Sequence, residues 1–382
     1  MSSGQSVTTQ LQLGDTTHQE DLTVFCPPGI TVETAKYPIL MSGILASTQP
    51  AEFLSIYDHP TAWRGLDREA IISMRRQLYR FLVPTDARSL VPKDVVESLQ
   101  QIALSVSPVA IGVEAPTLPP RRLHSFPGQL PMGSDILVKS FDIRSEPEIS
   151  RVAQKISQKD IPASEAICQL FDYDYALEQI ARLLAVGLLG MHKHRKLVPI
   201  KNAFKISIDS YIDNALLDLS EKPSSSTIRI HQSSLFGDSF IVVSAPGEPR
   251  VDYFQMEISQ DRVQRHHSIE SVHYGSSNAK ASLYASHARF SSYQEMMRQN
   301  ESSHVFVFHL NRDNRNSTFG PWIARAGVQE AYCGEGVEID SIANFEIILD
   351  ALLYPKLPIW AEGTPLLKRL GFEPSSTLEH YL

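Results

Sequence analysis

The spacing of apolar residues divides the chain into a helical first half and a mixed second half. In the first half, apolar residues recur every three or four positions, which is the period of a helix that buries one face. Asp67 stands where it can cap the first helix, and Gly190 where it can end the last one. Helices are therefore expected over residues 67–80, 92–104, 146–155, 162–171 and 175–189.

Beyond about residue 222, short runs of β-branched and aromatic residues alternate with Gly/Pro turns, a pattern typical of strands. The runs at 226–230, 239–244 and 251–258 predict strands of one antiparallel sheet, and the most apolar run, at 304–310, predicts a buried strand. Helical patterns flank that run at 281–298, 321–332 and 342–353. We expect an α+β fold, with a helix-rich N-terminal half and an antiparallel or mixed sheet in the C-terminal half.

The composition indicates a globular protein with a polar tail. Residues 1–21 are rich in Ser, Thr and Gln and are expected to be disordered, ahead of a helix-rich region at 22–222 and a mixed α/β region at 223–382. No apolar run approaches the roughly 20 residues of a membrane span, and the polar N-terminus lacks the order of a secretion signal. We therefore expect a cytoplasmic protein without a membrane partner. The 3 cysteines are far apart and the histidines lack metal-ligand spacing, so no metal or cofactor is expected.

A block of positive charge stands out because the chain as a whole is acidic, with a formal net charge of −8. The block lies between residues 192 and 205 and contains Lys193, Arg195, Lys196, Lys201 and Lys205. Such a block on an acidic protein indicates binding of an anionic ligand. The alternative is a solvated helix end, where cations lie close to the last carbonyl groups.

A second polar segment follows the predicted strand at 304–310. Its arginines, Arg312 and Arg315, can bind phosphate, and Asn314 can pair with base edges or backbone. Trp322, in the first turn of the next helix, can stack on a base. The alternative is a polar surface loop in which Trp322 holds the helix to the core.

Several short segments resemble the archaeal Nre DNA-repair family and occur in the family's order between about residues 37 and 330. The matching segments are Tyr37-Pro38 with Gly43, 57–65, 71–75, 101–109, 163–166, 195–199 with 206–209, and 320–325. Among them, Arg195-Lys-Leu-Val-Pro199 stands intact, and Gly320-Pro-Trp-Ile-Ala-Arg325 is similar to a Gly-Val-Trp-Val-Val-Arg-Glu block. The chain lacks the N-terminal Cys-x-x-Cys knuckle that archaeal members commonly carry.

The resemblance implies a DNA-repair or DNA-maintenance factor that binds nucleic acid or a nucleotide in a basic groove. The groove would be lined by Lys193, Arg195, Lys196, Lys201, Arg312, Asn314, Arg315 and Trp322. The alternative is an enzyme that acts on nucleic acid or a nucleotide at the same groove, and a third possibility is an interaction scaffold.

Three residues are candidates for catalysis in the enzyme alternative. Asp209 and Asp213 are four residues apart, so they share one helix face and can hold Mg²⁺ near a phosphate, or else pair with Lys205. His287 is the third candidate, because related proteins carry a Gly-Gly-Tyr-Tyr-Ala-Ala-Arg motif near this position. A packed helix residue is the alternative for His287.

The last residues resemble a degenerate sliding-clamp-binding peptide. Archaeal relatives end in Gln-x-x-Leu-x-x-Phe-Phe, and here Leu378, Tyr381 and Leu382 fall at the hydrophobic positions, with Ser375 in place of the glutamine. One helical turn places such residues in an apolar pocket of a partner. Alternatively, these residues dock the terminus onto the protein's own core.

Overall fold

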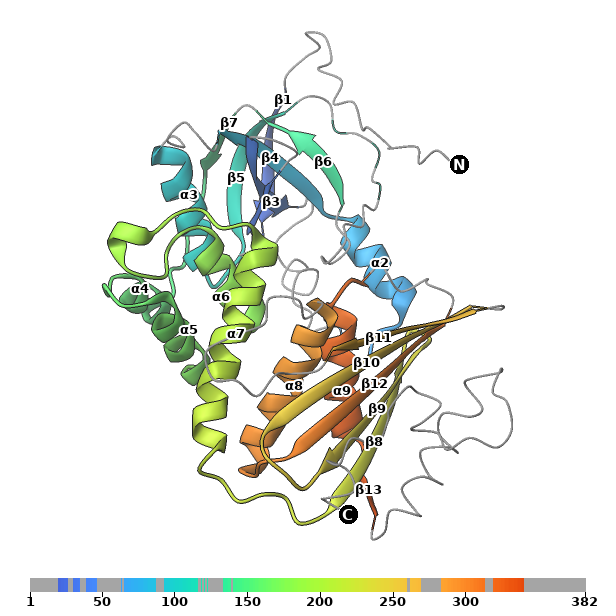
Figure 1. Cartoon of the computed structure of the whole chain (residues 1–382). Coiled ribbons are helices and arrows are strands. Elements are labelled where there is room, and N and C mark those ends of the chain that lie inside the picture. The colour runs from blue at the N-terminus through green and yellow to red at the C-terminus, as the bar shows by residue number, and fades with distance from the viewer. Residues whose placement is uncertain are drawn as a thin grey trace, which may run out of the picture.

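The computed structural model describes residues 20–26, 30–34, 39–46, 63, 65–86, 93–115, 118, 120, 122, 133–138, 140–259, 262–268, 283–312 and 319–339. Figure 1 shows small sheets at one end, a large sheet at the other, and a layer of helices between and beside them. The predicted α+β class is confirmed. None of the described helices has the length and apolar character that a membrane crossing requires.

The N-terminal half contains two small sheets that the apolar periodicity did not predict. The first has the order β1–β5–β7, from Glu20–Cys26, Val109–Ala115 and Ser140–Ile143. The second has the order β2–β3–β4–β6, from Ile30–Thr34, Ile39–Ala46, Tyr79–Asp86 and Ser134–Leu137. β4 pairs with β3 on one side and with β6 on the other, which places it in the interior of its sheet.

The helices described in this half are α2 (Arg68–Arg76), α3 (Lys93–Leu104), α4 (Arg151–Ser157), α5 (Ala163–Asp172), α6 (Leu177–Ala185) and α7 (Ile200–Leu219). The first five were predicted and have shifted ends, whereas the sixth, α7, was predicted only as the helix face that Asp209 and Asp213 share. Asp67 caps α2 as predicted, since its side chain accepts a hydrogen bond of 2.7 Å from the Ala70 amide. The helix predicted at 67–80 ends at Arg76, with Gln77 as its C-cap, because the apolar run that follows belongs to β4.

The C-terminal half forms one mixed sheet of six strands. Its order is β11–β10–β12–β9–β8–β13, from Arg262–Ser268, Arg250–Ser259, His304–Arg312, Asp238–Ala245, Ile228–Leu235 and Val337–Ile339. The three strands predicted first are present, but β12 inserts between β9 and β10. β12 runs parallel to β10, with Val251 opposite Val305, so the mixed alternative is the one observed.

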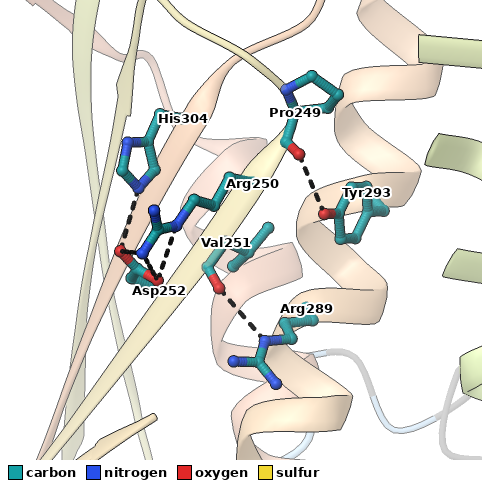
Figure 2. Close-up of polar contacts among 7 residues, drawn as sticks. All are labelled: Pro249, Arg250, Val251, Asp252, Arg289, Tyr293 and His304. Atoms are coloured by element: carbon teal, nitrogen blue, oxygen red, sulfur yellow. Dashed lines mark hydrogen bonds and ion pairs between the residues drawn. The ribbon is translucent and has the colours of Figure 1, made fainter. Parts of the chain in front are cut away.

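Two helices, α8 (Leu283–Gln299) and α9 (Trp322–Cys333), cover one face of this sheet. α8 runs antiparallel to β10: Arg289 Nε donates to the Val251 carbonyl at 3.2 Å, and the Tyr293 hydroxyl donates to the Pro249 carbonyl at 3.4 Å (Figure 2). α9 approaches β9 so closely at Gly327 that only a glycine fits there.

The hydrophobic core consists of two clusters, one around each half of the molecule. The cluster under the large sheet also takes in Trp63, Ile71 and Ile212, which precede residue 222 in the chain. α2 and α7 therefore pack together with the C-terminal sheet and its helices. This packing places two helices from the first half of the sequence against the sheet and helices of the second half.

Candidate nucleic-acid interface and buried polar centre

The positive charge lies on a loop of fixed shape between α6 and α7. This basic loop, residues 187–199, includes the short 3₁₀ helix η3 (His192–His194). Gly187 and Gly190 have φ of +73° and +108°, which allow its two sharp turns. Leu188 and Leu189 are buried, and the Val198 amide donates to the Ala185 carbonyl at 2.9 Å.

Arg195 holds the basic loop by bonding to backbone carbonyl groups. Its Nε donates to the Gly190 carbonyl at 2.8 Å, and its Nη2 donates to the Lys159 carbonyl at 3.0 Å, in the turn between α4 and α5. In the same turn between α4 and α5, Asp160 Oδ1 accepts a hydrogen bond of 2.7 Å from the His192 amide. Burial lowers the pKa of Arg195, while the neighbouring Asp160 carboxylate acts in the opposite direction.

The lysines of this region point into solvent. Lys193, Lys196 and Lys201 are exposed, and the described part of the chain offers none of them a carboxylate within ion-pair distance. Lys201 lies in the first turn of α7, where no side chain caps the helix. The N-terminus of a 20-residue helix adds partial positive charge to that of the lysines.

For Asp209 of α7, the ion pair with Lys205 that was given as the alternative is the arrangement observed. Lys205 Nζ lies 2.5 Å from Asp209 Oδ2, one helical turn away. Asp213 lies one turn further on; burial raises its pKa, and so does Asp209, whereas Lys205 lowers it. Asp209 therefore has a protein cation as its partner.

The polar segment after β12 is described only in part. Arg312 is the last residue of β12 and lies opposite Ile258 of β10. Asn314 and Arg315 lie outside the described residues, as do Leu378, Tyr381 and Leu382 at the C-terminus. Figure 1 shows α4 and α5, on whose connecting turn the basic loop rests, on the side of α7 away from the large sheet. A single groove that includes both segments stays a prediction.

Trp322 lies in the core, with 8% of its surface exposed. Its ring packs edge-to-face against Trp63, with 5.2 Å between centroids, and the Arg75 guanidinium lies 5.8 Å from the Trp63 ring. The packed alternative for Trp322 is thus the arrangement observed. The contact joins the start of α9 to the segment that precedes α2.

His287 is the central residue of a buried polar centre between the helices. It is 6% exposed, and its ring lies 5.8 Å from that of Phe204 on α7. Burial, and then the nearby Arg325 cation, lower the pKa of His287 well below its usual value, so the ring is neutral at neutral pH. Arg325 itself forms a buried ion pair with Glu178 of α6. Among the residues that the structure describes, Nδ1 of His287 has no hydrogen-bond partner.

A second buried chain of polar groups crosses the helix-facing side of the sheet. Nε2 of His309 lies 2.8 Å from Oδ2 of Asp238, and Nδ1 of the same ring lies 2.7 Å from the Tyr253 hydroxyl oxygen. Because an ionised carboxylate can only accept, a neutral His309 donates to Asp238 and accepts from Tyr253. Asn311, two residues along the strand, has a buried Oδ1 for which the described parts of the chain provide no hydrogen-bond partner.

His304 lies five residues before His309 on β12 and so faces the opposite side of the sheet. Its Nε2 lies 3.1 Å from Asp252, which also pairs with Arg250 (Figure 2). In the described parts of the chain, no group of three His, Cys, Asp or Glu side chains is arranged to hold a metal ion. Asp238, Tyr253 and Glu178 were not predicted as part of a site, because no motif or spacing in the sequence distinguishes them from other polar residues.

These features define an α+β protein with an exposed basic loop and a buried polar centre where its two halves meet. A family model described as "Archaeal Nre, N-terminal" matches residues 5–261, and the chain belongs to this family. The chain is 23% identical over 325 residues to "DNA repair protein NreA" of Archaeoglobus fulgidus, covering 80% of this chain and 78% of the relative. It is 22% identical over 361 residues to "DNA repair protein NreB" of the same organism, covering 92% and 90%.

A more distant relative is "DNA repair protein NreA" of Haloferax volcanii, at 20% identity over 237 residues, covering 60% of this chain and 56% of the relative. No solved structure matches the chain. The resemblance between this chain and the family is therefore confirmed, and two of the segments that carried it meet in the Trp63–Trp322 contact. Trp63, Trp322 and Arg325 all lie at the junction of the two halves.

Proposed function

We propose that this protein is a DNA-repair factor that binds nucleic acid through the basic loop and the start of α7. Its relatives in two archaeal organisms are named DNA repair proteins. The residues that carry the binding in this proposal are Lys193, Lys196 and Lys201. Arg312 and Arg315 extend the same interface if the segment after β12 approaches it.

The observation that supports this proposal most is the set of exposed lysines, on an otherwise acidic chain, for which no carboxylate of the described residues lies within ion-pair distance. Ammonium groups without carboxylate partners keep their charge for a ligand, and phosphate groups of nucleic acid are the common target of such clusters. The net charge of −8 argues against nucleic-acid contact over the whole surface, so binding depends on a local basic region such as this one.

Fluorescence anisotropy of a labelled duplex and a labelled single strand tests the proposal at salt concentrations between about 50 and 200 mM. Three phosphate contacts give a slope of log affinity against log salt of about −2.7 for duplex DNA. Replacing Lys193, Lys196 and Lys201 together by Ala should abolish that dependence. Arg298→Ala is the matched control, since Arg298 is an exposed cation at the far end of α8. Unchanged binding by the triple variant would contradict the proposal.

The alternative function is an enzyme that modifies nucleic acid or a nucleotide. The observation that favours it is the buried, neutral His287, whose Nδ1 has no hydrogen-bond partner among the residues that the structure describes. A neutral imidazole can act as a general base. Asp209 and Asp213 would serve as Mg²⁺ ligands once Lys205 is displaced. Turnover of a nucleotide and oligonucleotide panel that is lost in His287→Gln supports this function, and absence of turnover excludes it for those substrates.

Binding to a sliding clamp through Leu378, Tyr381 and Leu382 is a further part of the proposed role in repair. These residues have the spacing of anchors on one helical turn. Calorimetry of the last dozen residues as a peptide, titrated into the clamp of the host, tests this. No heat at high micromolar peptide would contradict it, and a peptide with Tyr381→Ala is the control.

A further inference from the structure

The basic loop is bonded to the turn between α4 and α5 at two separate points. Arg195 donates to the Lys159 carbonyl, and Asp160 accepts from the His192 amide. Arg195 also closes the loop upon itself through the Gly190 carbonyl. The three bonds fix the backbone on both sides of Lys193 and directly before Lys196.

We infer that Arg195 and Asp160 are positioning residues, which hold the basic loop in the shape that presents its lysines to a phosphodiester backbone. The inference rests on the proposed nucleic-acid binding. Arg195 uses its Nε and one Nη2 hydrogen on protein carbonyls, so its guanidinium is committed to the loop rather than extended toward a ligand. A preformed loop loses less conformational entropy when it binds, which strengthens binding without adding a contact.

Asp160 gives the sharpest test, because charge and positioning predict opposite results. Its carboxylate lies beside the basic block, 3.5 Å from His192 Nδ1, so removing its charge should strengthen phosphate binding by simple electrostatics. Its Oδ1 also accepts the His192 amide, so removing that acceptor should release the loop. Asp160→Ala removes both the charge and the acceptor, whereas Asp160→Asn removes only the charge.

We expect Asp160→Ala to bind a labelled duplex several-fold more weakly than the wild type, and Asp160→Asn to bind at least as tightly as the wild type. Tighter binding by Asp160→Ala than by the wild type would overturn the inference, because charge alone would then govern the site.

Arg195 is tested by comparing Lys and Ala at the same position. A lysine keeps the charge but cannot form the planar fork to two carbonyls. We expect Arg195→Lys and Arg195→Ala to lose affinity to a similar extent, about tenfold, with the salt slope of the wild type retained in both. A direct phosphate contact predicts the opposite: Arg195→Lys keeps its affinity, and Arg195→Ala lowers the slope by about 0.9. Lys196→Ala, which should lower the slope by that amount, is the matched control.

Hydrogen exchange of the loop amides separates failure of this inference from failure of the proposed function. The His194 amide donates to the Met191 carbonyl at 2.8 Å and should exchange faster in Arg195→Lys and in Asp160→Ala than in the wild type, with or without DNA. If the wild type binds no nucleic acid, the proposed function fails while the exchange data still decide whether the loop is held. Unchanged exchange in both variants would overturn the positioning role, and unchanged thermal unfolding confirms that the variants are folded.

Discussion

The buried ion pair between Arg325 of α9 and Glu178 of α6 supports a quantitative prediction for stability. The two side chains are 6% and 5% exposed, and they join helices that are 147 residues apart in the chain. Arg325→Met keeps most of the side-chain volume but leaves the Glu178 carboxylate buried without its cation. Breaking a buried pair in this way costs about 3–5 kcal/mol of the free energy of unfolding.

Urea unfolding followed by tryptophan fluorescence measures this cost, since Trp63 and Trp322 pack against each other near the same junction. The double variant Glu178→Gln with Arg325→Met removes both charges and should recover most of the lost stability, because replacing a whole buried pair is often close to neutral. Either of two results would refute the reasoning: Arg325→Met costing under about 1 kcal/mol, or a double variant no more stable than the single one.

Two further predictions concern packing and pH. A Cβ at Gly327 would lie 2.2 Å from the Phe240 ring, so Gly327→Ala should lower the free energy of unfolding in urea by about 1–3 kcal/mol. Gly334→Ala is the control: its Cβ would make only an ordinary contact at 3.4 Å, so the loss of stability should be far smaller. Burial lowers the pKa of His287 in the folded protein. Below about pH 6.5 the unfolded chain therefore binds a proton at this histidine that the folded protein excludes, and the free energy of unfolding should fall as the pH drops further. His287→Leu should weaken that dependence in unfolding curves measured against pH, and an unaltered profile would count against the argument.

The apolar pattern predicted the helices and strands in which apolar residues recur with a regular helical or strand period. α3, α5 and the strands β9, β10 and β12 were expected within a few residues of their observed bounds, because each has a strong period of its own. β4 was missed because it contains Arg80, which read as a solvated helix position. The buried Arg80 guanidinium forms an ion pair with Asp135, which lies 55 residues away in the chain, and no local sequence pattern indicates so distant a partner.

The sheet order and the hydrogen bonds of Arg195 could not be predicted from the sequence for the same reason. β12 lies between β9 and β10 through pairings that depend on the whole fold. The acceptors of Arg195 are the Gly190 and Lys159 carbonyls, and every residue type carries a carbonyl. The charge block itself could be read directly, since charge on a surface loop needs no partner to be recognised.

The family segments therefore serve two different physical purposes, and position in the sequence does not separate them. Trp322 and Arg325 lie within five residues of Gly320, and both are buried at the junction of the two halves. Arg195 and Lys196 are adjacent, yet the guanidinium bonds to the protein's own backbone while the ammonium group faces solvent. A charged residue in a family segment is thus evidence for ligand binding only when its polar atoms lack protein partners. By that criterion the proposed nucleic-acid interface reduces to the lysines of the basic loop and the start of α7, and the bonds of Arg195 to backbone carbonyls set it apart from them.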